Sequence, residues 1–351
     1  MSTSMNYVTV YKDPERDEFL ASSRNSAPIF DKSTKAWIVT NPDLCRELLG
    51  SANLVPALAI ESQEVPGALE SRLGSLAYAC QHIPLCHTGD DHASLRRRLS
   101  EHLASRRPAM AEWMAEALPL YVEPFRTSGR VDVVNEVLDP LIRGMMQSLA
   151  GIPMPTELDV TQTSRVFDKF SSLSRRTEVA GLMTGLHRHV REMMGPEASE
   201  DDVGLRLGLV VIGHDATVGT FGESLVRLLS ESEGRPLNQI AFRKFAPQTG
   251  VPFAERIVQT PFSAAGVDFE AGQRLRLVLQ TFAHSPPEEH HRFFGVGAHS
   301  CLGRPASTDL WSAFGALLGQ LSSRVRVLSY ELTPNNYIFN VPSKFLVEVM
   351  T

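Results

Sequence analysis

The chain has 351 residues, of which 43% are hydrophobic and 21% are charged, and its formal net charge is −6. This is the composition of an ordinary globular protein with a sizeable core, and its negative charge argues against general nucleic-acid binding. Four cysteines without paired spacing favour a reducing, cytoplasmic location. The polar residues 1–19 do not predict a signal peptide, and no run approaches the ~20 apolar residues of a membrane span.

The length alone suggests about two domains, but no stretch rich in proline, glycine and serine divides the chain. We therefore predict one domain over residues 1–351. Short strands are predicted at residues 8–11 and 36–39, and Asn41-Pro42-Asp43 predicts the start of a helix that ends near Leu49. Together they predict a small β-rich lobe over about residues 1–50. Residues 52–88, interrupted by prolines, predict loops and short helices.

A series of helices is predicted next. Gly89 and two aspartates suit a helix start, and His92 and Arg96, four residues apart, share one face of that helix. Apolar periodicity predicts further helices over residues 109–126, 131–149, 161–174 and 178–194. The alternative for His92 and Arg96 is a solvated basic face.

The longest apolar helix is predicted over residues 205–229, with an acidic start at residues 197–202. Asp215 lies inside it and is followed by Ala216 and Thr217. An aspartate in so apolar a helix is costly unless it has a partner or a function, and the alternative is a residue that faces the surface. Beyond this helix, residues 337–341 predict a strand whose turn dips into a cavity.

The most informative stretch is Phe294-Gly-Val-Gly-Ala-His-Ser-Cys-Leu-Gly303. Cys301 ends a glycine-rich loop just before an apolar helix, where unpaired N–H groups and the helix dipole favour a thiolate. Such a thiolate is a good soft ligand for a transition metal. A zinc site at His290, His291, His299 and Cys301 is the alternative metal, but the spacing of these residues is not typical of zinc. The other three cysteines, Cys45, Cys80 and Cys86, are interpreted as buried small hydrophobes.

This decapeptide resembles the cysteine loop of cytochromes P450, Phe-x-x-Gly-x-His/Arg-x-Cys-x-Gly, with every fixed position filled. The resemblance implies a mainly α fold with a small β lobe. It implies haem b as the cofactor, Cys301 as the iron ligand, Phe294 packed near the sulfur, and Gly303 as the last fixed residue of the loop. The cationic partners of the haem propionates, by the same resemblance, are His92, Arg96, Arg256 and His299.

Two family signatures are incomplete. The central helix resembles Ala/Gly-Gly-x-Asp/Glu-Thr, so Asp215 is implied to assist proton delivery, but Ala216 replaces the threonine and Thr217 follows one residue later. The Glu-x-x-Arg segment keeps Arg243 and has Ile240 in place of the glutamate. We hypothesise that Glu289 pairs with Arg243 instead.

The chain is also short for this family. We predict a truncated P450-like fold, trimmed in the lid, after the central helix and before the cysteine loop, with a pocket that is more open or covered by a partner protein. The implied function is the monooxygenase-type oxidation of a small or medium apolar molecule in secondary metabolism, with electrons from a ferredoxin-type partner. The alternatives are peroxide-dependent or rearranging haem chemistry, and a haem-binding homologue without turnover.

Overall fold

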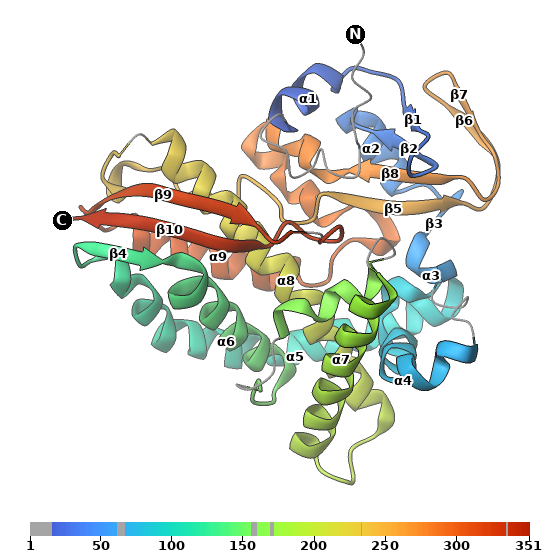
Figure 1. The fold of residues 1–351 in the computed structure, drawn as a ribbon, viewed down its shortest axis with the longest axis horizontal. Coiled ribbons are helices and arrows are strands. Elements are labelled where there is room, and N and C mark those ends of the chain that lie inside the picture. Colours follow the sequence, from blue (N-terminus) through green and yellow to red (C-terminus); the bar gives the residue numbers. More distant parts are fainter. Residues whose placement is uncertain (1–15, 62–66, 156–159, 169–171, 233, 335) are drawn as a thin grey trace.

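A computed structural model describes residues 16–61, 67–155, 160–168, 172–232, 234–334 and 336–351. Helices dominate the described residues. A five-stranded sheet lies at the upper right of the view and a three-stranded sheet at the left (Figure 1). The helices are α1 (Arg16–Ser23), α2 (Pro42–Leu49), α3 (Ala57–Glu61), α4 (Gly67–His82), α5 (Gly89–Val122), α6 (Asp139–Ala150), α7 (Leu173–Met194), α8 (Glu200–Glu231) and α9 (Arg304–Leu318). Residues 8–11, predicted as a strand, lie outside the described residues.

Short 3-10 turns connect many of these helices. They are η2 (Pro84–Cys86), η3 (Glu123–Phe125), η5 (Val160–Phe167), η6 (Leu237–Gln239), η7 (Leu279–His284), η8 (Pro287–Phe294) and η9 (Gly297–His299), and η4 (Val133–Leu138) is a π-helical turn. Between α8 and the next strand, the described residues hold only η6. Between the last strand of the larger sheet and α9, they hold only η7, η8 and η9. Among the described residues, neither interval contains an α-helix.

The larger sheet has the strand order β1-β2-β8-β5-β3. Its strands are β1 (Ile29–Asp31), β2 (Ala36–Val39), β3 (Leu54–Pro56), β5 (Phe253–Val258) and β8 (Arg274–Val278), so the N-terminal strands pair with strands from late in the chain. A hairpin joins β6 (Phe262–Ala264) to β7 (Val267–Phe269), and Ala265 and Gly266 form its turn with φ of 49° and 76°. The third sheet consists of β4 (Gly129–Asp132), β10 (Pro342–Met350) and β9 (Arg324–Leu332).

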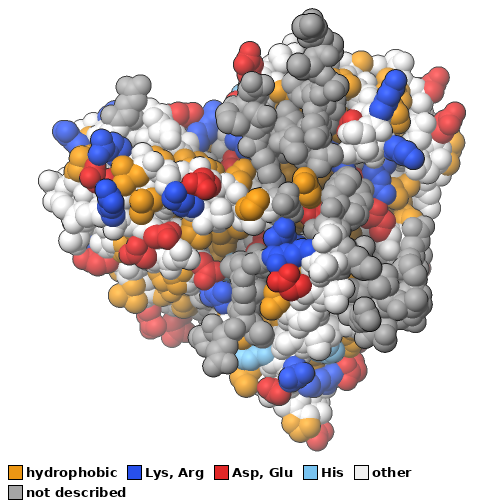
Figure 2. All heavy atoms as spheres, viewed as in Figure 1, with side chains coloured by type: hydrophobic (Ala, Val, Ile, Leu, Met, Phe, Trp, Pro, Cys, Tyr) orange, Lys and Arg blue, Asp and Glu red, His pale blue; other side chains and the backbone are white. Residues whose placement is uncertain are grey.

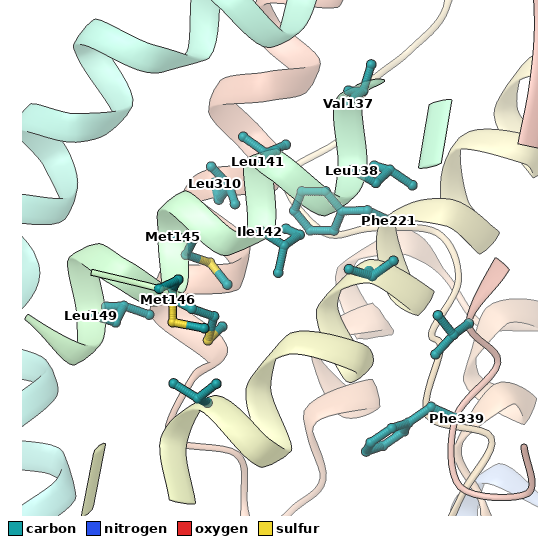
Figure 3. Packing of buried hydrophobic residues seen from close by; sticks show 14 of the residues in the cluster. Val137, Leu138, Leu141, Ile142, Met145, Met146, Leu149, Phe221, Leu310 and Phe339 are labelled. Carbon is teal, nitrogen blue, oxygen red and sulfur yellow. The ribbon is translucent and has the colours of Figure 1, made fainter. Parts of the chain in front are cut away.

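The main hydrophobic core lies between α6, α8 and α9. Leu141, Ile142 and Met145 project from one face of α6, and Phe221 of α8 and Leu310 of α9 meet them (Figure 3). All five are at most 2% exposed, and burying each side chain contributes about 1.5–3 kcal/mol. This packing holds α8 rigidly across the middle of the molecule (Figure 1).

The helix after residue 88 is longer than predicted. The sequence placed one helix near residues 88–99 and another over residues 109–126, but α5 runs without a break through Pro108. Contacts on both sides of the proline anchor the helix to α6. Arg106 Nε donates to Ser148 O (2.9 Å), and the Trp113 ring packs against Gly144 so closely that a Cβ on Gly144 would lie 2.4 Å from the ring. Tertiary contacts therefore outweigh the hydrogen bond that Pro108 removes.

Other boundaries also differ from the predictions. The helix predicted from residue 131 begins as strand β4, because Val131 pairs with Val347 of β10. Residues 337–341, predicted as a strand, form a loop, because the Asn336 side chain accepts hydrogen bonds from Ile338 N and Phe339 N at 3.1 Å each. The region 52–88 contains the 16-residue helix α4 as well as short elements. Ala36–Val39, the helix capped by Asn41 and the acidic start of α8 are as predicted.

Candidate functional site

The loop that carries Cys301 is tightly folded between η8 and α9. Gly295 and Gly297 have φ of 74° and 77°, which favours glycine, and a Cβ on Gly297 would lie 3.0 Å from Gly50 Cα. Cys301 N donates to Phe294 O at 2.7 Å, which closes the loop and brings Cys301 to the N-terminus of α9.

The Cys301 sulfur faces a cavity deep in the protein. Burial raises the pKa of the Cys301 thiol, and the backbone N–H groups of Gly303 and Arg304, which favour the thiolate, only partly oppose this. These donors come from the exposed end of α9, where helix N–H groups have no intrahelical partner. They would stabilise the thiolate once a metal takes the place of its proton.

A group of cationic and imidazole side chains gathers beside Cys301. The His92 and His299 rings lie 4.0 Å apart, and Arg96 donates to Ser300 O (2.7 Å) and Ser300 Oγ (3.1 Å). Arg256, on β5, is 6% exposed, so it is not the surface residue that an edge strand would give. Residues from α5, β5 and the cysteine loop thus converge, although they are distant in sequence.

This group has no described anionic partner. Burial lowers the pKa of Arg256 to about 10, and burial together with His92, Arg256 and Arg96 lowers the pKa of His299 to about 3. His92 Nε2 is buried without a hydrogen bond, and no carboxylate in the described part of the chain pairs with these four side chains. Such a site is suited to an anionic group of a ligand, because a buried charge without a partner is costly.

The cavity has a volume of ≈ 410 Å³ and is mostly apolar. Its walls come from α8, η2, the cysteine loop and the loop between β9 and β10. Tyr337, Ile338 and Phe339 of the last loop line it, so this loop dips into the cavity as the sequence predicted. Phe294 and Gly303 line it beside Cys301.

On the central helix, Ala216 and Thr217 line the cavity. Thr217 Oγ1 donates to Gly213 O at 2.8 Å, and its oxygen can still accept a hydrogen bond. Asp215 is completely buried but is not among the cavity-lining residues. The alternative interpretation of Asp215 as a residue that faces the surface is therefore wrong. Its carboxylate is directed towards buried partners instead.

Those partners form a buried polar chain that the sequence did not reveal. Ser164 Oγ donates to Asp215 Oδ2, His214 Nδ1 lies 3.2 Å from Asp215 Oδ1, and His214 Nε2 lies 3.1 Å from Asp139 Oδ1. Arg143 Nε completes the chain with a 2.7 Å hydrogen bond to Asp139. The chain links α8 to η5 and α6 and reaches the partly exposed Asp139.

Protonation of His214 is favoured in this chain. Burial opposes it, but the hydrogen bonds and charges of Asp139 and Asp215 outweigh burial and raise the pKa of His214. Burial likewise opposes ionisation of Asp139, but the hydrogen bonds of His214 and Arg143 lower its pKa net. The imidazole of His214 thus lies between two carboxylates that both favour its protonated form.

The proposed pair between Glu289 and Arg243 is wrong. Glu289 lies in η8 and forms an ion pair at 2.5 Å with Arg292, three residues later in the same turn. Arg292 is therefore the better-placed cation. Arg243 lies in a loop after η6, exposes its side chain and accepts a hydrogen bond from Trp311 Nε1 at its main-chain oxygen. The zinc alternative also lacks support, because the described residues contain no group of three metal-ligating side chains.

The fold and the sequence can now be compared with known proteins. No family model matches the chain. It is 23% identical to the cytochrome P450 BJ-1 homolog of Sinorhizobium fredii, with 86% of each chain covered, and 22% identical to cytochrome P450 BJ-1 of Bradyrhizobium diazoefficiens, with 83% of each covered. The chain belongs to the cytochrome P450 superfamily.

Solved structures, a cytochrome P450 among them, agree with this assignment at the level of the fold. CalO2 has a TM-score of 0.77 at 16% identity, with 99% of both chains covered. Epothilone D-bound P450epoK has a TM-score of 0.74 at 12% identity, with 97% of this chain and 98% of that chain covered. The predicted mainly α P450 fold with a small β lobe is therefore confirmed.

Superfamily membership makes the chain a haem-thiolate oxidoreductase in general terms and implies a haem cofactor. The residues present fit that group. Cys301 offers a sulfur whose thiolate form is favoured by the N–H groups of Gly303 and Arg304. His92 Nε2, which is buried without a hydrogen bond, and Arg256, whose described partner is the Glu255 main-chain oxygen and no carboxylate, could hold the two carboxylates of a ligand. Among the described residues, no helix has the length and hydrophobicity required to cross a bilayer.

Proposed function

We propose that this P450 carries out a monooxygenase-type oxidation of a small or medium apolar molecule, in the setting of secondary metabolism and in the cytoplasm. The observation that carries the proposal is the Cys301 thiol, which faces an apolar cavity crossed by α8 and lies beside a cationic group without a described counter-charge. When bound, haem b supplies the oxidative chemistry, since a thiolate ligand favours O–O cleavage.

The chain's own residues would hold the cofactor and the substrate. Cys301 would bind the iron, and His92, Arg96, Arg256 and His299 would bind the propionates. The substrate would lie against the apolar side chains of α8 and the loop at residues 337–339, which also exclude water. A cavity with so few polar groups favours a hydrophobic body over a charged one.

Proton delivery is proposed to use Asp215 through the buried chain. His214 and Asp139 connect this carboxylate to the partly exposed Arg143. Because Asp215 does not line the cavity, a proton that reaches it needs a further carrier, and Thr217, whose oxygen can accept a hydrogen bond, is the nearest hydroxyl along α8. An ordered water or a substrate hydroxyl would complete the path past Ala216.

Electrons would come from a ferredoxin-type donor that docks on the cysteine side. Arg97 and Arg304 expose their side chains, whereas Arg98 is held by Asp201 at 3.0 Å. On the face shown in Figure 2, basic and acidic side chains are interspersed, so this view offers no broad basic surface. A second protein over the trimmed lid is also proposed. P450BioI, a fold neighbour (TM-score 0.73), is complexed with hexadec-9Z-enoic acid-ligated acyl carrier protein, so carrier-tethered substrates belong in the screen.

A peroxide-dependent reaction is the second candidate. Ala216 lies on the cavity wall without a hydroxyl, and Asp215 turns towards Ser164 and His214, so both residues of the usual proton path are altered. Turnover supported by peroxide without any reductase would favour this candidate over the first.

The carbon monoxide difference spectrum of the reduced protein tests the common basis of both candidates. We expect the band typical of a thiolate-ligated haem, its loss in Cys301→Ala, and its retention in the matched control Cys45→Ala, because Cys45 is buried and bonded to Val39 O. A colourless wild-type protein, or an unchanged band in Cys301→Ala, would refute the proposal. A screen for spin-state shifts then identifies substrates, and binding without such shifts or turnover would indicate a non-catalytic homologue.

A further inference from the structure

Ser300, the residue before Cys301, binds the guanidinium of Arg96 through two of its own atoms. Arg96 Nη1 donates to the Ser300 main-chain oxygen at 2.7 Å, and Arg96 Nη2 donates to the Ser300 hydroxyl at 3.1 Å. Arg96 lies in α5, whereas Ser300 lies in the cysteine loop, 204 positions later in the sequence. The contact therefore fastens the loop to α5 and fixes both terminal nitrogens of Arg96.

The other N–H groups of Arg96 stay available to a ligand. A guanidinium carries more N–H groups than these two hydrogen bonds use, and it presents them in a rigid plane. Arg96 and Ser300 both line the cavity, and Arg96 takes part in no described ion pair with a carboxylate. Because the plane is rigid, two fixed nitrogens also fix the direction of the remaining donors. Ser300 thus determines how Arg96 faces the cavity.

The same contact keeps a positive charge beside the cysteine. The Ser300 carbonyl that accepts from Arg96 belongs to the peptide bond that leads into Cys301, so the guanidinium lies within one peptide unit of that residue. Arg96 is half-buried, and charges interact more strongly there than in bulk water. Burial lowers the pKa of Arg96, and the negative charge of Cys301 partly opposes this.

Neither the backbone nor the family pattern requires a serine at position 300. Ser300 has φ of −60° and ψ of 144°, an extended conformation that any residue adopts. Its N–H group donates to Gly297 O at 3.1 Å, which needs no side chain. The position is also one of the variable ones in the cysteine-loop pattern. Among the described contacts, the hydroxyl of Ser300 has its one hydrogen bond with Arg96.

We propose that Ser300 is a positioning residue whose hydroxyl orients Arg96, so that Arg96 holds an anionic group of the cofactor and keeps its charge beside the iron ligand. Because Cys301 is proposed as that ligand, this role rests on the proposed function. Without the hydroxyl, Arg96 keeps only its bond to the main-chain oxygen, about which it can turn. The cofactor should then dissociate faster. The reduced iron–thiolate pair, which carries one more negative charge than the oxidised pair, should be less stabilised.

A double-mutant cycle of Ser300→Ala and Arg96→Met tests this role. Haem transfer to apomyoglobin and a spectroelectrochemical titration are carried out on the wild-type protein, the two single variants and the double variant. We expect Ser300→Ala to speed haem loss about threefold and to lower the equilibrium constant of one-electron reduction about threefold, or by about 28 mV. In the Arg96→Met background, Ser300→Ala should change neither quantity, because the hydroxyl acts through Arg96. Equal effects of Ser300→Ala in both backgrounds would overturn the proposal.

Two further variants serve as controls. Ser300→Thr keeps a hydroxyl at this position and should restore the wild-type rate of haem loss and the wild-type potential. Ser105→Ala removes an exposed hydroxyl from the same helix as Arg96, one that donates to His102 O at 2.7 Å, and should change neither quantity. Wild-type values in Ser300→Ala, or threonine values that match those of alanine, would show that the hydroxyl does not position Arg96.

The apoprotein provides a readout that is separate from the proposed function. Without haem, Ser300→Ala should speed deuterium exchange of amides 297–303 about threefold, because the loop loses one of its two bonds to α5, and it should have no such effect in the Arg96→Met background. Unchanged exchange in Ser300→Ala would overturn the contact itself. A wild-type protein that takes up no haem, together with faster exchange in Ser300→Ala, would refute the proposed function and leave Ser300 with only the fastening of the loop.

Discussion

Replacing His214 with leucine is expected to destabilise the protein strongly. The substitution removes an imidazolium whose two nitrogens lie 3.1 Å from Asp139 and 3.2 Å from Asp215. Removing one partner of a buried ion pair costs about 3–5 kcal/mol, because a buried charge is left uncompensated. Here two carboxylates lose their common partner, so we expect a loss in the upper part of that range. Urea unfolding followed by circular dichroism measures it.

The matched control is His189→Leu. His189 is half-buried and its Nε2 lies 2.8 Å from Pro153 O, so it makes one ordinary hydrogen bond that is open to solvent. Its replacement should cost no more than about 1.5 kcal/mol. Equal losses in the two variants would contradict the idea that His214 is charged and clamped between α6 and α8.

The pH dependence of the same difference gives an independent check. A histidine whose folded pKa is raised contributes stability that is fully present below its unfolded pKa of about 6.5 and is lost as pH rises through the folded value. The cost of His214→Leu should therefore be larger near pH ~6 than near pH ~10. Asp139, whose folded pKa is lowered, contributes stability that is lost only as pH falls through that lower value, outside this window. A cost that grows with pH would refute the argument.

Three further changes test other parts of the site. Arg256→Met should weaken haem retention by about tenfold or more and leave the apoprotein equally or more stable, because it removes a buried charge without a described counter-charge. Haem transfer to apomyoglobin measures the retention, and urea unfolding measures the stability. Tighter haem retention in the variant would contradict this role of Arg256. Ala216→Thr should raise the fraction of consumed dioxygen that appears as product, and an unchanged or lower fraction would count against a weakened proton path. Gly219→Ala should lower the free energy of unfolding by about 1–3 kcal/mol, since its Cβ would lie 2.5 Å from Asn340 O. The control Gly181→Ala in α7, where a Cβ would have no atom within 4 Å, should not destabilise the protein. Similar unfolding midpoints for the two variants would contradict this packing.

Local patterns made part of the site predictable. The cysteine loop is defined by glycines, an aromatic residue and a cysteine within ten positions, so its conformation depends mostly on near neighbours. The central helix was equally clear, because a long apolar run with an acidic start has few alternatives. Its N-cap Ser199, whose side chain accepts from Asp202 N, lies within the predicted acidic segment.

Long-range contacts made the remainder unpredictable. The direction of Asp215 depends on Ser164 in η5 and on His214, whose own partner Asp139 lies 75 positions earlier in the sequence. Nothing in the sequence around Asp139 distinguishes it from an ordinary helix-start aspartate. Likewise, the sequence of residues 337–341 is typical of a strand. The segment forms a loop because the Asn336 side chain accepts hydrogen bonds from two of its N–H groups, and this is not evident from the sequence.

The departures from the family pattern are connected in space. Without a Glu-x-x-Arg helix, the segment after η6 is an irregular loop, and α8 itself holds that loop in place. Thr220 Oγ1 accepts from Gly250 N at 3.1 Å, and Ser224 Oγ donates to Gln248 O at 3.2 Å. Gly219 and Gly250 let the two backbones touch, since a Cβ on Gly250 would lie 2.5 Å from Gly219 C. The central helix thus serves both as cavity wall and as anchor for the shortened segment, and Thr220 takes part in both.

This double role explains why polar side chains on α8 are directed as they are. Thr220 and Ser224 hold the shortened loop, and His214 and Asp215 hold η5 and α6, so four polar residues of this helix are committed to packing neighbours. Thr217 and Thr220 both line the cavity, but among the described contacts only Thr220 also accepts a hydrogen bond from the shortened loop, whereas Thr217 only donates, to Gly213 O. Thr217→Val should therefore alter product coupling with little loss of stability, whereas Thr220→Val should lower stability because Gly250 N loses its acceptor. Oxygen-consumption assays measure the coupling in both variants, and urea unfolding measures their stability. If Thr217→Val lowered stability and Thr220→Val altered only the coupling, the roles assigned to the two hydroxyls would be refuted.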